Sequence, residues 1–160
     1  MTHDQDEALS VADRVVLLDA GRIVAEGTPE ALWTHPPNAW SARFLGFRNV
    51  ALARVAGGVI ETPWGRLAGP HVDAALADGP AVVVLRPAAI VREPTGAIRG
   101  RVISRRFRGD HVLLLVAAGE GPPLHVEARE CDLPAVGEEV RLDVRAGGVH
   151  LIAEPSRPTK

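Results

Sequence analysis

The sequence is poor in the residues that build cross-linked, metal-rich or membrane-spanning proteins. Its single cysteine, Cys131, excludes a disulfide framework and a cysteine-rich zinc site. No apolar run approaches the ~18 residues that a membrane-spanning helix requires. The polar, acidic amino terminus is the opposite of a secretion signal. We therefore expect a soluble, cytosolic protein.

The sequence also has little excess of one charge sign over the other, and few aromatic residues. The formal net charge is -2 and 24% of the residues are charged, so the composition indicates neither a strongly basic nucleic-acid binder nor an acidic tail. The aromatic residues are three tryptophans and three phenylalanines. In contrast, 46% of the residues are hydrophobic, and 16 glycines and 13 prolines interrupt the chain. This composition favours a core of short elements joined by turns over a helical bundle.

The first part of the chain mixes helical and hairpin patterns. Residues 6–12 place apolar side chains at helical spacing, and two short apolar runs at 14–19 and 22–26 flank an Ala-Gly turn, which predicts a hairpin. Thr28 is expected to cap a short helix that starts at the following proline. Asn38 is expected to cap a second helix, over residues 39–45, which Gly46 ends.

Three aromatic residues of this region are spaced so that they share one helical face. Trp40, Phe44 and Phe47 stand at positions i, i+4 and i+7. Such a face packs either on the body of its own domain or against a partner protein. We favour packing within the domain.

From about residue 49 the pattern changes to short strands between glycine and proline turns. The candidate strands are residues 50–55, 59–62, 81–85, 97–104, 112–117, 124–128, 140–144 and 149–152. Their spacing of roughly 8–15 residues predicts a small barrel or sandwich. One weak helical pattern lies between residues 69 and 79.

The most informative motifs lie near the amino terminus. In chain order they are Thr2-His3-Asp4-Gln5, Ala12-Asp13-Arg14, Gly21-Arg22-Ile23 and Gly27-Thr28-Pro29-Glu30. Together they resemble the ATP-binding subunit of ABC transporters from its switch-histidine loop onward. In that family the loop is followed by a helix, a strand, a hairpin and another helix. The resemblance covers residues 1–48 and implies the C-terminal end of an α/β nucleotide-binding domain.

The resemblance assigns the role of switch histidine to His3. Its imidazole would hydrogen-bond the γ-phosphate of ATP, bound with Mg²⁺, and would help to hold the attacking water. A histidine suits this role because its reference pKa of ~6.5 lets it donate to a phosphate oxygen at neutral pH. His3 is therefore the candidate catalytic and ATP-binding residue, and we assign no metal ligands. Without the flanking motifs, a histidine beside acidic residues near a terminus would be interpreted as a solvated surface residue.

The motifs that complete an ABC-type ATPase are absent from the sequence. It has no G-x-x-x-x-G-K-[ST] phosphate loop, no Leu-Ser-Gly-Gly-Gln signature and no apolar strand ending in Asp-Glu. Because the phosphate loop cradles the phosphates and holds magnesium, we expect that this chain alone does not bind or hydrolyse ATP. Met1 stands where the family has the last apolar residue of a buried strand. We hypothesise that the reading frame begins inside a longer one; a separate upstream chain that supplies the missing half is the alternative.

The second region resembles the TOBE domain that follows many importer ATPases. The residues that carry this resemblance are Val82–Ile90 with its Arg86-Pro87 pair, Gly100-Arg101-Val102, Phe107–His111 and Val136-Gly137-Glu138-Glu139-Val140. The predicted fold is therefore mixed: an α/β remnant over residues 1–48, an all-β OB-like TOBE domain over 49–155 and a disordered tail over 156–160. The family commonly has a glutamate after the Arg-Pro pair, whereas Ala88 and Ala89 stand here.

Our first hypothesis is the C-terminal part of an ABC importer ATPase of the iron(III), thiamine or polyamine group. The resemblance implies ATP-driven transport by the complete protein, whose homodimer would engage two permease subunits at the inner face of the cell membrane. The alternative, from another class, is a freestanding TOBE-type module that regulates a protein partner or binds an oxyanion.

A nucleic-acid partner is the less favoured interpretation of the arginine-rich stretch between residues 99 and 108. OB domains bind single strands through a basic groove with stacking aromatic residues, and Phe107 is the one aromatic residue available to stack there. We expect a solvated basic strand face and no nucleic-acid partner.

The resemblance also implies that residues 1–48 lack the parallel sheet on which their helices would pack. We therefore expect apolar side chains of this region to be exposed or docked elsewhere, and the isolated chain to be poorly soluble or to self-associate. The candidates are Leu9, Val15, Leu17, Trp40 and Phe44.

Overall fold

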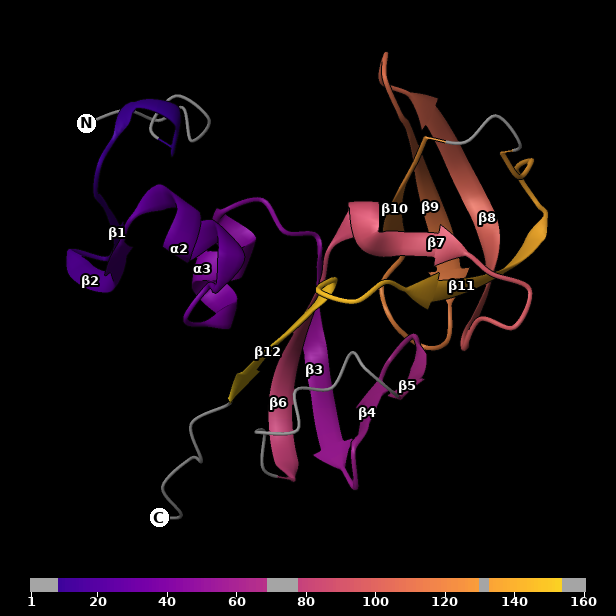
Figure 1. Cartoon of the computed structure of the whole chain (residues 1–160), viewed down its shortest axis with the longest axis horizontal. Helices are drawn as coiled ribbons and strands as arrows, with labels where there is room; N and C mark the ends of the chain where they lie inside the picture. Colours follow the sequence, from indigo (N-terminus) through magenta and orange to yellow (C-terminus); the bar gives the residue numbers. More distant parts are fainter. Residues whose placement is uncertain (1–8, 69–77, 130–132, 154–160) are drawn as a thin grey trace. The chain divides into compact units, whose positions relative to one another are not determined.

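The computed structural model describes residues 9–68, 78–129 and 133–153 (Figure 1). The chain divides into two compact units, residues 1–47 and residues 48–160. In the described segments, no helix is long and apolar enough to cross a membrane.

A two-stranded hairpin forms much of the first unit. Strand β1 (Val15–Asp19) pairs with the antiparallel strand β2 (Arg22–Gly27). The turn needs positive φ angles at both central residues, and Ala20 (φ 47°) and Gly21 (φ 76°) supply them. The predicted hairpin is confirmed, and residues 9–11 of the predicted first helix are helical.

Two short helices follow with the predicted caps. The hydroxyl of Thr28 accepts a hydrogen bond from the amide of Ala31 at the start of α2 (Pro29–Thr34). The Asn38 side chain accepts one from the Ser41 amide at the start of α3 (Ala39–Phe44), and its amide nitrogen donates to the Val24 carbonyl of β2. Asn38 thus caps α3 and also ties it to the hairpin.

The three aromatic residues predicted to share one face are divided between two contacts. Trp40 and Phe44 stack with their ring centroids 5.0 Å apart, and Phe44 is 39% exposed. Phe47 is buried and lies 4.8 Å from Trp33. The helix ends before Phe47 at Gly46, whose φ of 90° redirects the chain. The expectation of a single face is therefore wrong at Phe47.

The apolar residues exposed in the first unit are only partly the expected ones. Of the five candidates, Phe44 is 39% exposed, whereas Leu17 is docked: it pairs with Ala25 across the hairpin and both are buried. Its neighbours Val16 and Leu18 are exposed, as is Ile23 opposite Leu18. Because side chains alternate between the two faces of a strand, only one face of the hairpin is covered.

The second unit consists of two five-stranded antiparallel sheets. The first has the order β12-β6-β3-β4-β5 and the second the order β10-β9-β8-β11-β7. Their bounds are β3 (Asn49–Ala56), β4 (Val59–Thr62), β5 (Gly65–Ala68), β6 (Gly79–Leu85), β7 (Ile90–Arg92), β8 (Ile98–Phe107), β9 (Val112–Ala118), β10 (Leu124–Ala128), β11 (Glu139–Val144) and β12 (Val149–Ala153). A 3-10 turn, η1 (Pro87–Ala89), leads into β7.

The second sheet forms a near-closed barrel, because its end strands β10 and β7 also contact one another. Both sheets of the unit contribute to a common core, for example through Val83 of β6, Val116 of β9 and Leu142 of β11. All eight predicted strands are present. Strands β5 and β7 were not predicted, and the weak helical pattern near residue 69 lies largely outside the described residues. The predicted fold class, an α/β end followed by an OB-like β domain, is confirmed.

Trp64 joins the turn before β5 to the loop after β9. Its indole nitrogen donates a hydrogen bond of 2.7 Å to the carbonyl of Pro122, and its side chain is buried. The amides of Glu120 and Gly121 both donate to the Pro63 carbonyl. These contacts hold together two segments that belong to different sheets.

Candidate functional site

The candidate residue His3 lies outside the described residues, so its role as the switch histidine stays a prediction. The motifs that follow it adopt the elements that the resemblance implies. Arg14 directly precedes β1, the Gly21-Arg22-Ile23 motif forms the turn and the start of β2, and Thr28 begins α2. The described part of the first unit thus has the order of local structure that the resemblance implies.

A cavity of about 460 Å³ lies against the barrel sheet of the second unit. Strands β7, β9, β10 and β11 supply most of its wall, and η1, the segment before β11 and Arg145 just after β11 supply the rest. The lining side chains are Ala88, Ile90, Val91, Arg92, Leu114, Val116, Val126, Glu127, Ala128, Arg129, Leu133, Pro134, Val140, Leu142 and Arg145. The wall is mainly apolar, and four of its residues carry charge.

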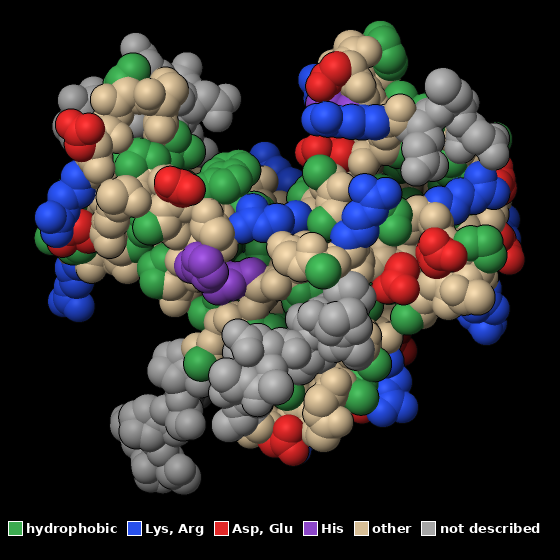
Figure 2. Space-filling model, in the orientation of Figure 1, with side chains coloured by type: hydrophobic (Ala, Val, Ile, Leu, Met, Phe, Trp, Pro, Cys, Tyr) green, Lys and Arg blue, Asp and Glu red, His purple; other side chains and the backbone are tan. Residues whose placement is uncertain are grey.

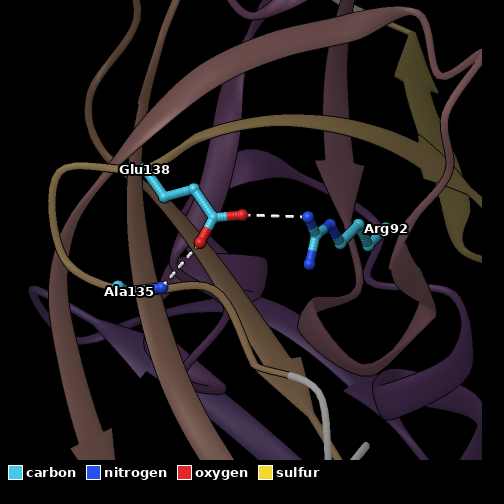
Figure 3. Close-up of polar contacts among 3 residues, drawn as sticks. All are labelled: Arg92, Ala135 and Glu138. Atoms are coloured by element: carbon cyan, nitrogen blue, oxygen red, sulfur yellow. Dashed lines mark hydrogen bonds and ion pairs between the residues drawn. The ribbon is translucent and has the colours of Figure 1, made fainter.

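A carboxylate fixes one side of this cavity (Figure 3). Oε1 of Glu138 lies 2.9 Å from Nη2 of Arg92, which is at the end of β7. Its other oxygen, Oε2, accepts a hydrogen bond of 3.0 Å from the Ala135 amide. Glu138 therefore holds the turn after Pro134 and the guanidinium of a lining arginine at the same time.

The remaining charged residues of the wall differ in their partners. Arg129 lies 3.7 Å from Asp110, and both are largely exposed. Arg145 has no ion pair with any described residue. Glu127 is the one acidic lining residue among those described. This arrangement can bind a molecule non-covalently, through apolar contact and charge. Among the described residues, no three His, Cys, Asp or Glu side chains gather to hold a metal ion.

Three groups of the second unit have shifted pKa values. A hydrogen bond of 2.8 Å between His111 and Asp110 lowers the pKa of this exposed carboxyl. Burial, with a smaller contribution from the charge of Arg48, lowers the pKa of His125. Burial also lowers the pKa of Arg86. None of these groups lines the cavity, but Asp110 lies 3.7 Å from Arg129, which does.

The arginine-rich strand β8 presents an exposed face. Arg101 pairs with Glu139 at 3.0 Å, and Arg99 stands opposite Arg141 across the pair with β11. Figure 2 shows basic side chains interspersed with acidic ones over the second unit. Phe107 is 76% exposed, while Trp64, the other described aromatic residue of this unit, is buried. The basic face therefore lacks a row of stacking aromatic residues in the part of the unit described.

Sequence reasoning did not identify the cavity. Arg92 and Glu138 are 46 residues apart, and no local pattern links an arginine at a strand end to a glutamate in a turn. The motif that contains Glu138 was recognised only as part of the TOBE resemblance. Ala88, one of the two alanines that follow the Arg86-Pro87 pair, lies on the cavity wall.

The sequence comparisons with known proteins agree with one another. Residues 71–152 match the TOBE domain family. The Fe(3+) ions import ATP-binding protein FbpC of Streptomyces avermitilis is 42% identical over 142 residues, covering 88% of this chain and 40% of the relative. The protein of the same name in Streptomyces coelicolor is 40% identical over 159 residues, which cover 99% of this chain and 45% of the relative. The spermidine/putrescine import ATP-binding protein PotA of Clostridium novyi is 32% identical over 162 residues, which cover 98% of this chain and 45% of the relative.

A solved structure shares the fold. The cytoplasmic molybdate-binding protein ModG, with molybdate bound, superposes with a TM-score of 0.51 over 68% of this chain and 98% of its own. At 14% identity this similarity concerns the fold alone. The chain spans less than half the length of the curated relatives described above. Because the family match covers more than half of the chain, the chain belongs to the TOBE domain family, and it corresponds to the C-terminal portion of an ABC importer ATP-binding subunit.

Proposed function

We propose that this chain works as part of the ATP-hydrolysing subunit of an ABC importer, and that the imported solute is ferric iron. The observation that carries the proposal is the match to the Streptomyces coelicolor ferric-ion import protein, which runs through 99% of the chain at 40% identity, against 32% for the polyamine import protein. A shared TOBE domain alone would align only the second unit. The match instead includes the hairpin and the capped helices of the first unit.

In this proposal His3 acts on ATP in the complete site. Its imidazole donates a hydrogen bond to the γ-phosphate and orients the attacking water, and Mg²⁺ bound with the nucleotide neutralises phosphate charge. The 160 residues contain no phosphate loop, so the chain by itself does not bind ATP. The rest of the site comes from sequence of the kind that its relatives carry outside the matched region.

The proposed assembly follows from the same relationship. Two copies of the complete subunit form a dimer, which contacts two permease subunits at the cytoplasmic face of the membrane. ATP hydrolysis in the dimer then drives solute uptake through the permeases. The TOBE unit contacts its counterpart in the dimer and does not contact nucleic acid.

The test joins the chain to the missing part of the site. The region of the Streptomyces coelicolor relative that precedes its match is fused to this chain, and ATP hydrolysis is measured with Mg²⁺. We expect the fusion to hydrolyse ATP, and His3→Ala to lower the rate on the order of 10²-fold, as removal of a positioned hydrogen-bond donor does. Arg66→Gln, on the exposed side of β5, serves as the control that keeps the wild-type rate.

The isolated chain is measured in parallel by calorimetric titration with Mg-ATP. Nucleotide binding by the 160 residues alone would contradict the proposed division of the site. An inactive fusion, or an active one that is unaffected by His3→Ala, would favour the freestanding regulatory module instead.

A further inference from the structure

The cavity of the second unit has a size and lining that ATP hydrolysis does not require. Its volume of about 460 Å³ lies within the range of roughly 300–1,000 Å³ typical of small-molecule sites. Most of the lining residues on β9, β10 and β11 are apolar, but Leu114, Val126 and Leu142 are at most 3% exposed and offer little accessible surface. A molecule in the cavity would therefore meet mainly the partly buried apolar side chains around them, Val91, Ala128 and Leu133.

The charged residues of the wall favour an anion. Three arginines and one glutamate line the cavity. Arg92 is already held by Glu138, and Arg129 lies near Asp110. Arg145 has no acidic partner in the described part of the chain. An unpaired guanidinium beside an apolar wall attracts a carboxylate or phosphate, with which it can form two charge-assisted hydrogen bonds.

We propose that this cavity binds a small amphipathic anion, with a short aliphatic body and a carboxylate or phosphate at one end. The aliphatic body contacts Val91, Ala128 and Leu133, next to the buried Leu114 and Val126, and Arg145 holds the anionic end. Arg92 adds a second positive charge in a fixed orientation. The proposal is independent of the transport function, because none of these residues belongs to the proposed ATP site.

Glu138 is a positioning residue in this proposal. It does not itself line the cavity, but it holds the Arg92 guanidinium and the Ala135 amide (Figure 3). Leu133 and Pro134, which do line the cavity, directly precede Ala135. The turn is pinned further by the Gly137 amide, which donates to the Val102 carbonyl of β8 at 2.8 Å. The segment before β11 is thus fixed against the barrel.

The test uses the full chain and probes of matched length. Octanoate and hexyl phosphate carry the two anionic ends, octylamine carries the opposite charge, and octanol carries none. Binding is measured by calorimetry, and the methyl NMR signals of Leu114, Val126 and Leu133 report its place. We expect at least one of the two anions to shift these signals and to bind more tightly than octylamine and octanol. The preference between the two anions identifies the anionic group.

Variants separate charge from shape. Arg145→Gln should weaken anion binding about tenfold through loss of the charge-assisted hydrogen bonds, whereas Glu127→Gln should strengthen it by removing the like charge. Arg66→Gln, in the other sheet, should change nothing. Ala128→Phe should abolish binding by filling the cavity while leaving every charge in place. Circular dichroism of each variant checks that it is folded.

Three results would overturn the proposal. The cavity methyl signals could remain unshifted by both anions, octylamine could bind as tightly as octanoate, or Arg145→Gln could bind with unchanged affinity. Glu138→Ala adds a positioning test on the free chain: it should shift the methyl NMR signals of Leu133, which precedes the turn held by Glu138, whereas Glu139→Ala, which alters the neighbouring exposed pair, should not.

Discussion

The side chain of Asn49 forms two hydrogen bonds with the backbone of His125. Its Nδ2 donates to the His125 carbonyl and its Oδ1 accepts from the His125 amide, each at 2.8 Å. Nδ2 also donates to the Leu85 carbonyl at 3.2 Å. Asn49 is completely buried, and it links the first residue of β3 to β6 and to β10 of the other sheet. A buried amide is tolerated here because its donor and acceptor are both satisfied.

Asn49→Ala should destabilise the second unit strongly. The substitution leaves the amide and carbonyl of His125 without their partner inside the protein. Each buried unsatisfied group costs about 1–3 kcal/mol, and we expect a loss of about 3 kcal/mol in the free energy of unfolding. Urea unfolding, followed by the fluorescence of Trp64 in a background in which Trp33 and Trp40 are replaced by phenylalanine, measures it. Glu61→Gln, at a half-exposed ion pair, is the control, and an equal midpoint for the two variants would contradict the prediction.

Gly119 and Gly58 provide a matched test of steric contact. Both have positive φ, 53° and 76°, so alanine carries a similar backbone strain at each. A Cβ at Gly58 would meet open space, whereas one at Gly119 would collide with the Pro63 carbonyl oxygen. We expect Gly58→Ala to cost about 1 kcal/mol and Gly119→Ala to cost several times more. Thermal unfolding by calorimetry measures both; similar melting temperatures would contradict this account of the turn.

His125 should make stability depend on pH. Burial lowers the pKa of His125 in the folded state below its unfolded value, so around and below that value the unfolded chain binds more protons. Stability is therefore expected to fall as pH decreases from 7 toward 5. His125→Gln should flatten this dependence, because the Asn49 contacts use only the backbone of His125. The urea midpoints of both proteins are measured at pH 5, 6 and 7. If the midpoint of His125→Gln changed with pH as much as that of the wild type, His125 would not be the cause of the pH dependence.

Glu138→Ala should loosen the turn before β11. The variant loses the hydrogen bond to Ala135 and the ion pair to Arg92. Because both charged side chains of this pair are about two-fifths exposed, the ion pair adds only about 0.5–1 kcal/mol. Hydrogen exchange at Ala135 should accelerate more than fivefold, the factor expected for a local loss of about 1 kcal/mol. Glu139→Ala should leave the exchange rate of this amide unchanged. If the Ala135 amide of Glu138→Ala exchanged as slowly as in the wild type, Glu138 would not hold the turn.

Much of the local structure could be predicted because its causes lie within a few residues. The Thr28 and Asn38 caps each bond an amide three residues ahead, and the hairpin turn depends on its own two residues. The eight strands were recognisable from apolar runs between glycine and proline turns. Strands β5 and β7, with 4 and 3 residues, are too short to show alternation and exist because longer strands pair with them.

The site could not be predicted in the same way. Contacts between residues distant in sequence could also not be predicted elsewhere in the chain. Phe47 does not share the face of Trp40 and Phe44, because Gly46 redirects the chain, and it packs against Trp33. The cavity exists because β7, β10 and β11 meet in one barrel, and Arg92 meets Glu138 across 46 residues. The family, the caps, the turns and most strands could be predicted from the amino-acid sequence, since they depend on neighbouring residues. Which distant side chains share a wall depends on strand order and register, and these become known only when the strands have paired in the fold.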